Sequence, residues 1–183
     1  VSSEETVQTT LPTQTLSVST QNTELVSIPD DWKSACAFVY SLHYEAKRNQ
    51  NDFYLGKASQ GWDTLGGKRE GNETPEECMI REVQEELGVH NVDNIEYIGY
   101  DSYSKSVLYK VTTNDWPKIP TNDSVKEIQF FSVDEAKNAD LSFRGRQHLR
   151  LLNQYAYKQK MQVKNAQVVS TERPEITNDK LQT

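Results

Sequence analysis

The chain of 183 residues contains little cysteine and no long apolar segment. Its only cysteines are Cys36, which lies in an apolar run, and Cys78, which lies in a stretch with a helical pattern. Two thiols in such surroundings are typical of buried free cysteines, and a chain without disulfides fits a reducing compartment, so we expect a cytoplasmic protein. No apolar run approaches the length of a membrane span, and the mean hydropathy of −0.78 agrees, so no membrane partner is expected.

Positive charge is also missing from residues 1–32, which contain neither Lys nor Arg. Secretory signals and mitochondrial transit peptides need positive charge, so this segment resembles neither. The chain begins at Val1 instead of a methionine, which is compatible with import into an organelle after presequence removal and with release from a polyprotein. The sequence does not decide between these origins.

Acidic residues outnumber basic ones, giving a net charge of −7 and an isoelectric point of about 5.0. This balance argues against a protein that coats nucleic acids without sequence preference. It does not exclude a nucleotide substrate, because a bound divalent cation would invert the local field. The length suits one domain with a full core and is too short for two.

Polar segments flank a central region with hydrophobic patterning. Residues 1–28 are rich in Ser, Thr and Gln without a sustained period, which predicts a disordered polar N-terminal tail. Residues 163–183 are similarly polar and are predicted to form a flexible C-terminal tail. The folded domain is therefore expected at residues 29–162.

Hydrophobic periodicity predicts a domain of mixed strands and helices. The pair Gly66-Gly67 follows the third predicted strand and predicts a sharp turn that lets the backbone approach a ligand. Strands are expected at residues 34–42, 52–58, 62–65, 95–103, 106–112 and 126–132, and helices at 75–87, 133–138 and 141–160, the last interrupted near Gly145.

The first predicted helix has strong end signals. Thr74 is a favourable N-cap, Pro75 suits the first helical position, and Glu77 completes a Thr-x-x-Glu capping box. Gly88 is placed to end the helix in a left-handed conformation. A helix over residues 75–87 is therefore predicted from local signals alone.

Three glutamates gather on one face of this helix. At about 100° per residue, Glu82, Glu85 and Glu86 fall within an arc of roughly 100°, and the apolar residues of the helix occupy a different arc that would face the core. Like charges three and four residues apart repel and weaken a helix. Hard divalent cations need several carboxylate oxygens close together. For the three glutamates alone a solvated acidic face is the default interpretation, and the full spacing of the surrounding motif favours a metal site.

Residues 67–89 carry particular residue types at the fixed spacing of a known motif. The segment reads GKREGNETPEECMIREVQEELGV and matches the pattern G-x5-E-x7-R-E-U-x-E-E-x-G-U, with U a bulky aliphatic residue, at every defined position. It resembles the Nudix box, the signature of the Nudix hydrolases. The resemblance implies an α/β fold, a Nudix-type α/β/α sandwich around a mixed β-sheet. It also implies Mg²⁺-assisted hydrolysis of a nucleoside diphosphate linked to another group.

Metal ligands follow from this resemblance by position. It implies that Glu82, Glu85 and Glu86 coordinate Mg²⁺, or Mn²⁺ in its place, together with the backbone carbonyl of Gly67. A metal that bridges phosphate oxygens neutralises their charge and orients an attacking water. Substitution then occurs at phosphorus and splits a pyrophosphate bond.

The other catalytic positions are Arg81 and a general base. Arg81 is implied to hold a glutamate in place, and Glu73 is one candidate partner. The base that takes a proton from the water is Glu85 or Glu86, or a carboxylate from a later strand, for which Glu127 is the candidate. The sequence leaves these three alternatives open.

Substrate-binding residues are expected beside the metal loop. Lys68 and Arg69 are candidates for contacts with phosphate oxygens, with a solvated rim as the alternative. Trp62 is the first candidate to stack on a nucleobase, although core packing is the favoured interpretation for each aromatic residue considered. The other aromatic candidates are Tyr54, Tyr100, Tyr103 and Phe130.

Residues 144–160 contain five cations and no acid. Such a stretch either binds a polyphosphate or RNA or forms a solvated helix face, and the solvated face is the favoured interpretation. No role is assigned to the histidines, which show no metal-ligand spacing. They are His43, His90 and His148.

The leading hypothesis is a Mg²⁺-dependent pyrophosphohydrolase that acts on a nucleoside triphosphate, a dinucleoside polyphosphate or a similar nucleotide-derived small molecule. One alternative is an mRNA decapping enzyme with capped RNA as its partner, and another is a non-catalytic module that binds a nucleotide or RNA. The complete set of glutamates favours catalysis, because a binding module could lose the ligands freely. The sequence does not indicate the oligomeric state.

Overall fold

The computed structural model describes residues 27–42, 51–118 and 125–171. Within these ranges one mixed sheet of seven strands has the order β3-β2-β1-β6-β5, with β4 paired to β1 and β7 paired to β2. The strands are β1 (Ser34–Ser41), β2 (Phe53–Ala58), β3 (Gly61–Asp63), β4 (Leu65–Lys68), β5 (Val92–Asp101), β6 (Ser106–Thr113) and β7 (Glu127–Phe131). The helices are α1 (Pro75–Leu87), α2 (Val133–Asn138) and α3 (Phe143–Thr171).

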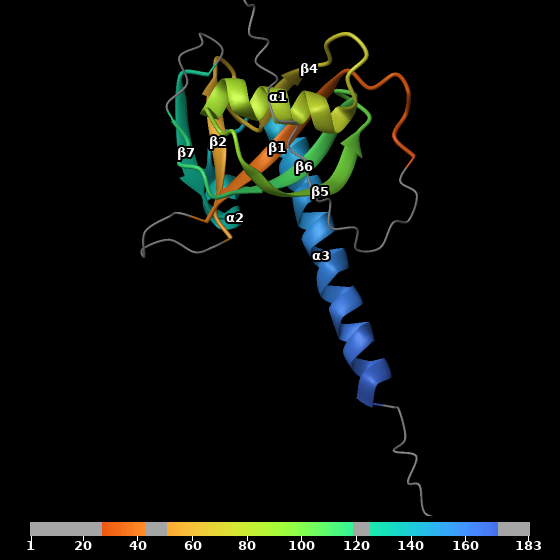
Figure 1. The fold of residues 1–183 in the computed structure, drawn as a ribbon. Coiled ribbons are helices and arrows are strands. Elements are labelled where there is room, and N and C mark those ends of the chain that lie inside the picture. The colour runs from red at the N-terminus through yellow and green to blue at the C-terminus, as the bar shows by residue number, and fades with distance from the viewer. Residues whose placement is uncertain (1–26, 43–50, 119–124, 172–183) are drawn as a thin grey trace, which may run out of the picture.

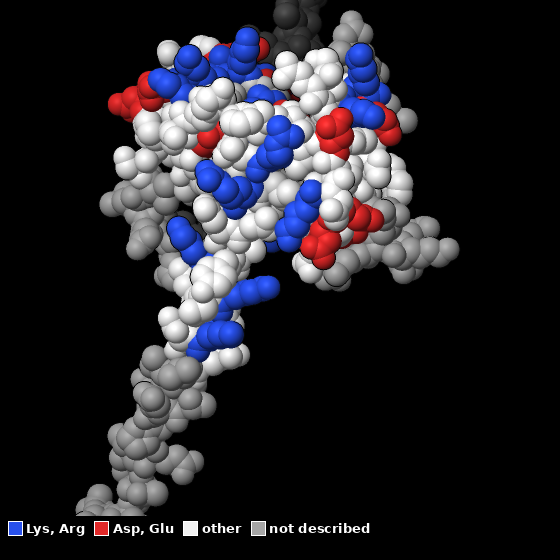
Figure 2. Space-filling view, turned by 180° about the vertical axis from the view of Figure 1, so that it is seen from behind, with Lys and Arg blue, Asp and Glu red and all other residues white. Residues whose placement is uncertain are grey.

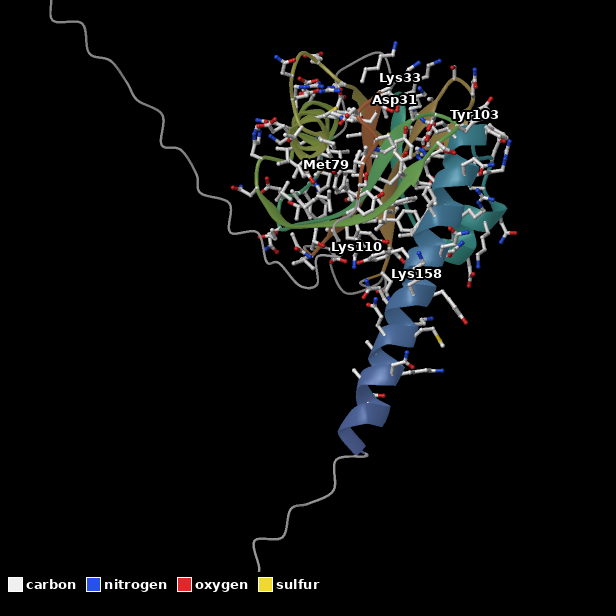
Figure 3. All side chains as sticks on the ribbon, turned by 90° about the vertical axis from the view of Figure 1, so that its right-hand side faces the viewer. Asp31, Lys33, Met79, Tyr103, Lys110 and Lys158 are labelled. Atoms are coloured by element: carbon white, nitrogen blue, oxygen red, sulfur yellow. The ribbon has the colours of Figure 1, made fainter. Side chains whose placement is uncertain are left out.

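Helices cover both faces of the sheet, as predicted. Strands β1 and β6 are parallel to each other, and the remaining neighbours are antiparallel. Figure 3 shows α1 on one side of the sheet and α3 on the other, with Met79 directed from α1 toward the strands. The chain therefore forms an α/β/α sandwich around a mixed sheet.

Strand β1 joins the two halves of the core. Ala37 and Val39 pack into the cluster beneath α1, whereas Phe38 and Tyr40 pack into the cluster beneath α2 and α3. This alternation follows from the two-residue period of a strand, whose successive side chains point to opposite faces. A strand buried on both faces reads as a continuous apolar run, which is how residues 34–42 were identified.

Helix α1 begins and ends where the local signals predict. The Thr74 hydroxyl accepts a hydrogen bond of 3.2 Å from the Glu77 N–H, and the Glu77 carboxylate accepts one of 2.8 Å from the Thr74 N–H. Gly88 ends the helix with a φ of 62° and donates to the Gln84 carbonyl. An N-cap of this kind contributes about 1 kcal/mol to stability.

The predicted turn at Gly66-Gly67 is wrong. The segment predicted as one short strand forms β3 and β4, and both glycines lie inside β4. Gly66 has a φ of 141°, and a Cβ there would lie 2.2 Å from the carbonyl oxygen of Ala35 on β1. Glycine is therefore needed for close approach between two strands, and the pattern alone could not distinguish this from a turn.

Helix α3 also differs from its prediction. It has no break at Gly145, where a Cβ would lie 2.6 Å from the Trp62 carbonyl, so this glycine lets the first turn approach β3. The helix continues to Thr171, which places residues 163–171 in a helix and not in the tail expected from residue 163. Residues 1–26 and 172–183 lie outside the described residues. Among the helices described, none combines the length and apolar character needed to cross a membrane.

Candidate metal centre and adjoining pocket

Glu86 is the most buried of the three glutamates on α1. Its side chain lies against β4, where Oε2 accepts a hydrogen bond of 2.8 Å from the Gly66 N–H, and the residue is 6% exposed. Burial raises the pKa of Glu86 to about 7, the charge of Glu82 adds to this shift, and the Gly66 hydrogen bond and Arg144 oppose it. A carboxylate held in such surroundings is stabilised as an anion by a nearby cation.

Glu82 occupies the space that a side chain on Gly67 would fill. A Cβ at Gly67 would lie 2.2 Å from Glu82 Oε1, so the absence of a side chain makes room for this carboxylate beside the β4 backbone. Glu82 Oε1 accepts a hydrogen bond of 2.8 Å from Arg81 Nη1. Burial raises the pKa of Glu82, and Arg81 opposes the shift. The Gly67 carbonyl lies 3.7 Å from the thiol of Cys78 on α1.

Arg81 connects α1 to the loop that precedes it. Its Nε and Nη2 donate to the two carboxylate oxygens of Glu73 at 3.2 and 2.9 Å, and Nη2 also donates to the Lys68 carbonyl at 2.9 Å. The hydrogen bonds from Arg81 lower the pKa of Glu73 to about 2. The predicted contact between Arg81 and Glu73 is therefore present, in the two-point geometry that guanidinium groups favour.

The glutamates fit a hard divalent cation by their chemistry. Glu82, Glu85 and Glu86 supply only carboxylate oxygens, and Gly67 adds a carbonyl, which are the ligands that Mg²⁺ and Mn²⁺ prefer. Glu85 is more exposed than the other two and lies 3.4 Å from Arg81 Nη1. In the described parts of the chain, no three His, Cys, Asp or Glu side chains already surround one metal position. The residues fit the metal in chemical type, and two of them, Glu82 and Glu86, lie beside Gly67 and Gly66 of β4.

Glu127, the candidate base from a later strand, lies at the start of β7. It is exposed and stands opposite Lys57 in the pairing of β7 with β2. Among the described residues, no hydrogen bond or ion pair joins it to the α1 glutamates. Its catalytic role stays a prediction.

Trp62 packs in the core, as the favoured interpretation of the aromatic residues expected, and the burial of its ring argues against the alternative of stacking on a base. The indole is 8% exposed and packs edge-on against Phe131, with ring centroids 5.0 Å apart. Its backbone also pairs with Leu141 at the start of the segment leading into α3. Trp62 therefore stabilises the core, because both its ring and its backbone are engaged.

Lys68 and Arg69 lie at the exposed end of β4. The Lys68 side chain is exposed, and its carbonyl accepts from Arg81. The Arg69 guanidinium lies over the ring of Trp32, 4.6 Å from its centroid, and donates to the Asp30 carbonyl. Arg69 is thus directed toward the segment before β1, and phosphate binding by these two residues stays a prediction.

Sequence reasoning missed a buried polar cluster behind the metal centre. Asp63, at the end of β3, accepts hydrogen bonds from the Thr64 N–H at 2.8 Å and the Ser142 hydroxyl at 2.9 Å. It also accepts from Arg144 Nε at 3.0 Å. Ser142 Oγ in turn accepts from the Gly145 N–H and so caps α3. The expected solvated face at residue 144 is therefore wrong, because this guanidinium is anchored by a buried carboxylate.

His148 lies at the centre of the same cluster. It is fully buried, with Nδ1 2.7 Å from the Thr64 hydroxyl and Nε2 3.5 Å from Asp101 Oδ2. Burial lowers the pKa of His148 to about 4, so the ring is neutral at pH 7. No sequence signal links these residues, because 84 positions separate Thr64 from His148. His43 lies outside the described residues.

A cavity of about 460 Å³ opens beside this cluster at the start of α3. Tyr103 and Phe143 stand at its wall with ring centroids 5.0 Å apart, and they are 76% and 49% exposed. Figure 3 shows Tyr103 next to the first turn of α3. The lining residues are Ala58, Ser59, Gln60, Asp63, Tyr103, Ser104, Ser142, Phe143 and Arg144.

Arg144 relates the cavity to Glu86 of the candidate metal site. Arg144 lines the cavity, and its positive charge lowers the pKa of Glu86 against the larger effect of burial. Among the aromatic residues considered from the sequence, Tyr103 is exposed at this wall, whereas Tyr54 is buried and stacks on Phe130. An aromatic wall, a fixed guanidinium and a metal centre therefore lie within one region of the molecule.

Solved structures share this fold. A Nudix hydrolase family member from Chromobacterium violaceum superposes with a TM-score of 0.54 at 19% identity, covering 78% of this chain and 96% of that one. A MutT/Nudix family protein from Listeria innocua gives a TM-score of 0.52 at 18% identity, covering 70% of this chain and 95% of that one. Both comparisons bear on the fold alone.

Curated relatives resemble a central part of the chain. The NAD-capped RNA hydrolase NudC of Pseudomonas aeruginosa is 35% identical over 77 residues, which are 40% of this chain and 27% of that protein. The 8-oxo-dGTP diphosphatase of Proteus vulgaris is 34% identical over 77 residues, which are 42% of this chain and 54% of that protein. The match thus spans about a quarter and about a half of their lengths. The family model of the NUDIX domain matches residues 45–152, more than half of the chain, and the chain belongs to the Nudix family.

Proposed function

We propose that this chain is a Mg²⁺-dependent pyrophosphohydrolase that cleaves a nucleoside diphosphate linked to another moiety. The observation that carries the proposal is the position of Glu82 and Glu86, whose carboxylates lie against the β4 backbone at Gly66 and Gly67. The fold alone would not require either contact. Two buried or half-buried carboxylates side by side are costly without a cation between or beside them.

Bound Mg²⁺, or Mn²⁺, would neutralise phosphate charge and lower the pKa of a coordinated water. The chain's own residues hold the carboxylates in place. Gly66 fixes Glu86 through its N–H, and Arg81 fixes Glu82 while it anchors the preceding loop through Glu73. Three carboxylates are proposed as alternatives for the base that accepts the proton of the water. They are Glu85, Glu86 and Glu127.

The cavity beside Arg144 is the proposed site for the nucleoside part of the substrate. Tyr103 and Phe143 offer exposed aromatic surface to a base, and Arg144 offers guanidinium donors in a geometry fixed by Asp63. The names of the curated relatives, an NAD-capped RNA hydrolase and an 8-oxo-dGTP diphosphatase, both refer to nucleotide derivatives. A nucleoside triphosphate or a dinucleoside polyphosphate satisfies both the metal centre and the cavity.

A panel of nucleotide derivatives tests the proposal directly. Release of phosphate or pyrophosphate is measured with Mg²⁺, with Mn²⁺ and with EDTA. Turnover is expected in the presence of either metal and not in EDTA. The panel includes nucleoside triphosphates, dinucleoside polyphosphates, and NAD-capped and m7G-capped RNA. Faster cleavage of a capped RNA than of every small molecule in the panel would support the decapping alternative. Absence of turnover on every compound with metal would support the non-catalytic module.

A further inference from the structure

Helix α3 carries an unusual concentration of positive charge. Residues 141–171 contain six cations and no acid, in a chain whose net charge is −7. Figure 2 shows Lys and Arg, without Asp or Glu, along the part of the helix that projects from the domain. Residues 156–167 are all exposed, so this part packs against no described element.

Four of the six cations form a single row along the helix, and Arg144 and Lys158 lie outside it. At about 100° per residue, Arg146, Arg150, Lys160 and Lys164 fall within an arc of about 80°, together with Asn153 and Tyr157 between them. The six positions follow alternating steps of four and three residues, so the row runs straight along the helix. We call these six residues the α3 row.

The row lies opposite the side of α3 that packs on the sheet. Around the helix, the buried residues His148 and Leu152 lie about 160° and about 120° from the middle of the row, whereas Leu149 is buried about 60° from it. Tyr157 is 65% exposed and lies between the two pairs of cations, nearer to Lys160. Phe143 at the cavity wall is one turn before Arg146, so the row starts beside the cavity.

The row makes little contribution to the described part of the fold, one hydrogen bond and no ion pair. Arg146 donates to the Leu141 carbonyl, but among the described residues no carboxylate lies within ion-pair distance of Arg146, Arg150, Lys160 or Lys164. Pairs such as Lys160 and Lys164 repel each other four residues apart. An exposed polar helix is ordinarily supported by pairs of opposite charge, which this one lacks. A partner of opposite charge would remove the repulsion.

We infer that the α3 row binds a single-stranded nucleic acid. From Arg146 to Lys164 the helix rises about 27 Å, which matches about eight stacked nucleotides at about 3.4 Å per phosphate. Four cations meet phosphates along this length, and Tyr157 stacks on an unpaired base. The exposed aromatic ring between cations favours a single strand, because the bases of a duplex are not available to it.

The test measures binding of the full chain to a fluorescently labelled single-stranded RNA of about 12 nucleotides with a 5′-hydroxyl. Binding is measured by fluorescence anisotropy in the presence of EDTA. This RNA contains no terminal pyrophosphate, so the result is independent of the proposed hydrolysis. We expect a dissociation constant between about 1 and 100 μM at about 50 mM salt, weakening with a log–log salt slope of about −3. The slope follows from about 0.7 per neutralised phosphate for four contacts.

The decisive variant replaces Arg146, Arg150, Lys160 and Lys164 by Gln, a residue that favours helices as well as Lys does. Its affinity is expected to fall about tenfold or more, and its salt slope to approach zero. A matched variant removes four exposed cations elsewhere and so has the same net charge. It substitutes Gln for Lys57, Lys118, Lys126 and Lys137 and is expected to bind RNA nearly as the parent does.

Tyr157 separates stacking from charge. Tyr157→Ala is expected to weaken RNA binding about fivefold or more, whereas Tyr157→Phe retains it. Equal losses in the two charge variants, or no binding by the parent chain at about 100 μM, would overturn the inference. Equal affinity for duplex RNA would also overturn the inference, since the partner would then be a duplex. Tight binding of a polyglutamate peptide that Tyr157→Ala leaves unchanged would overturn it as well, since the partner would then be an acidic protein.

Discussion

The carboxylate of Glu86 on α1 accepts a 2.8 Å hydrogen bond from the backbone N–H of Gly66 on β4. This contact fixes the C-terminal part of α1 to β4, the strand in which the Nudix box begins. Gly66 approaches β1 so closely that no other residue fits there. The position of Glu86 is thus set by the packing of β4 on β1 as well as by the helix itself.

Glu86→Gln is expected to lower kcat by a factor of about 10² to 10⁴ while the fold is retained. The amide oxygen of Gln can still accept from Gly66, but the negative charge needed for the metal or for proton transfer is lost. Because a buried charge is removed, the free energy of unfolding should not fall. Steady-state kinetics and denaturant unfolding measure the two effects. Asp93→Asn, at an exposed position outside the site, serves as the control, and near-normal turnover by Glu86→Gln would contradict the site assignment.

Three glycines should respond differently to alanine. Gly66→Ala places a Cβ 2.2 Å from the Ala35 carbonyl at a φ of 141°, so it should destabilise the fold by about 3 kcal/mol or more. Gly71→Ala has a φ of 52° but nothing within 4 Å, so only a backbone cost of about 1 kcal/mol is expected. Gly67→Ala displaces the Glu82 carboxylate and should reduce Mg²⁺ affinity more than stability.

Urea unfolding gives the order of the three free energies, and titration with Mg²⁺ gives the metal affinities. If Gly66→Ala cost no more than Gly71→Ala, the close approach of β4 to β1 would be wrong. If Gly67→Ala left Mg²⁺ affinity unchanged, Glu82 would not be a ligand in the way proposed.

Local signals predicted helix α1, whereas the burial of Trp62 and the polar cluster around His148 depend on long-range contacts. The caps at Thr74 and Gly88 and the contact of Arg81 with Glu73 were available from spacing, because each lies within a few turns of one segment. Trp62 was kept as a candidate for substrate stacking beside the favoured core packing, because an aromatic residue near the box has the same sequence pattern whether it is buried or exposed. Its burial depends on Phe131, 69 residues later, which the sequence does not bring near.

The buried cluster around His148 was likewise invisible, since Thr64 and Asp101 approach it only when three segments pack together. The basic stretch shows the opposite case. The sequence revealed its composition, but its alignment into a row depended on α3 continuing without a break through Gly145 and beyond Lys160.

Stability should fall in mild acid because His148 is buried in its neutral form. Its pKa in the folded chain is lowered to about 4, below the ordinary value of 6.5, so the unfolded chain binds the proton more tightly. The contribution of His148 to the free energy of unfolding is therefore present above pH 6.5. It is lost as the pH falls toward 4, by an amount on the order of 2–3 kcal/mol. His148→Gln removes this titration, so its unfolding free energy should change less between these two pH values than that of the parent. An identical pH dependence in both proteins would show that His148 does not titrate in this way.

Substitutions of Tyr103 and of Trp62 should have different effects on substrate binding and on stability. Trp62→Ala removes a buried indole and is expected to cost about 3–5 kcal/mol of unfolding free energy. Tyr103→Ala removes a ring that is 76% exposed, so stability should change by less than about 0.5 kcal/mol. If the cavity holds the nucleoside, the same substitution should weaken nucleotide binding in EDTA about fivefold or more, with Tyr103→Phe retaining affinity. Tyr157→Ala, on the same protein but away from the cavity, should leave the affinity for a mononucleotide unchanged. Equal nucleotide affinity in Tyr103→Ala and the parent would place the base elsewhere even if hydrolysis is observed, because binding in EDTA does not depend on the metal centre.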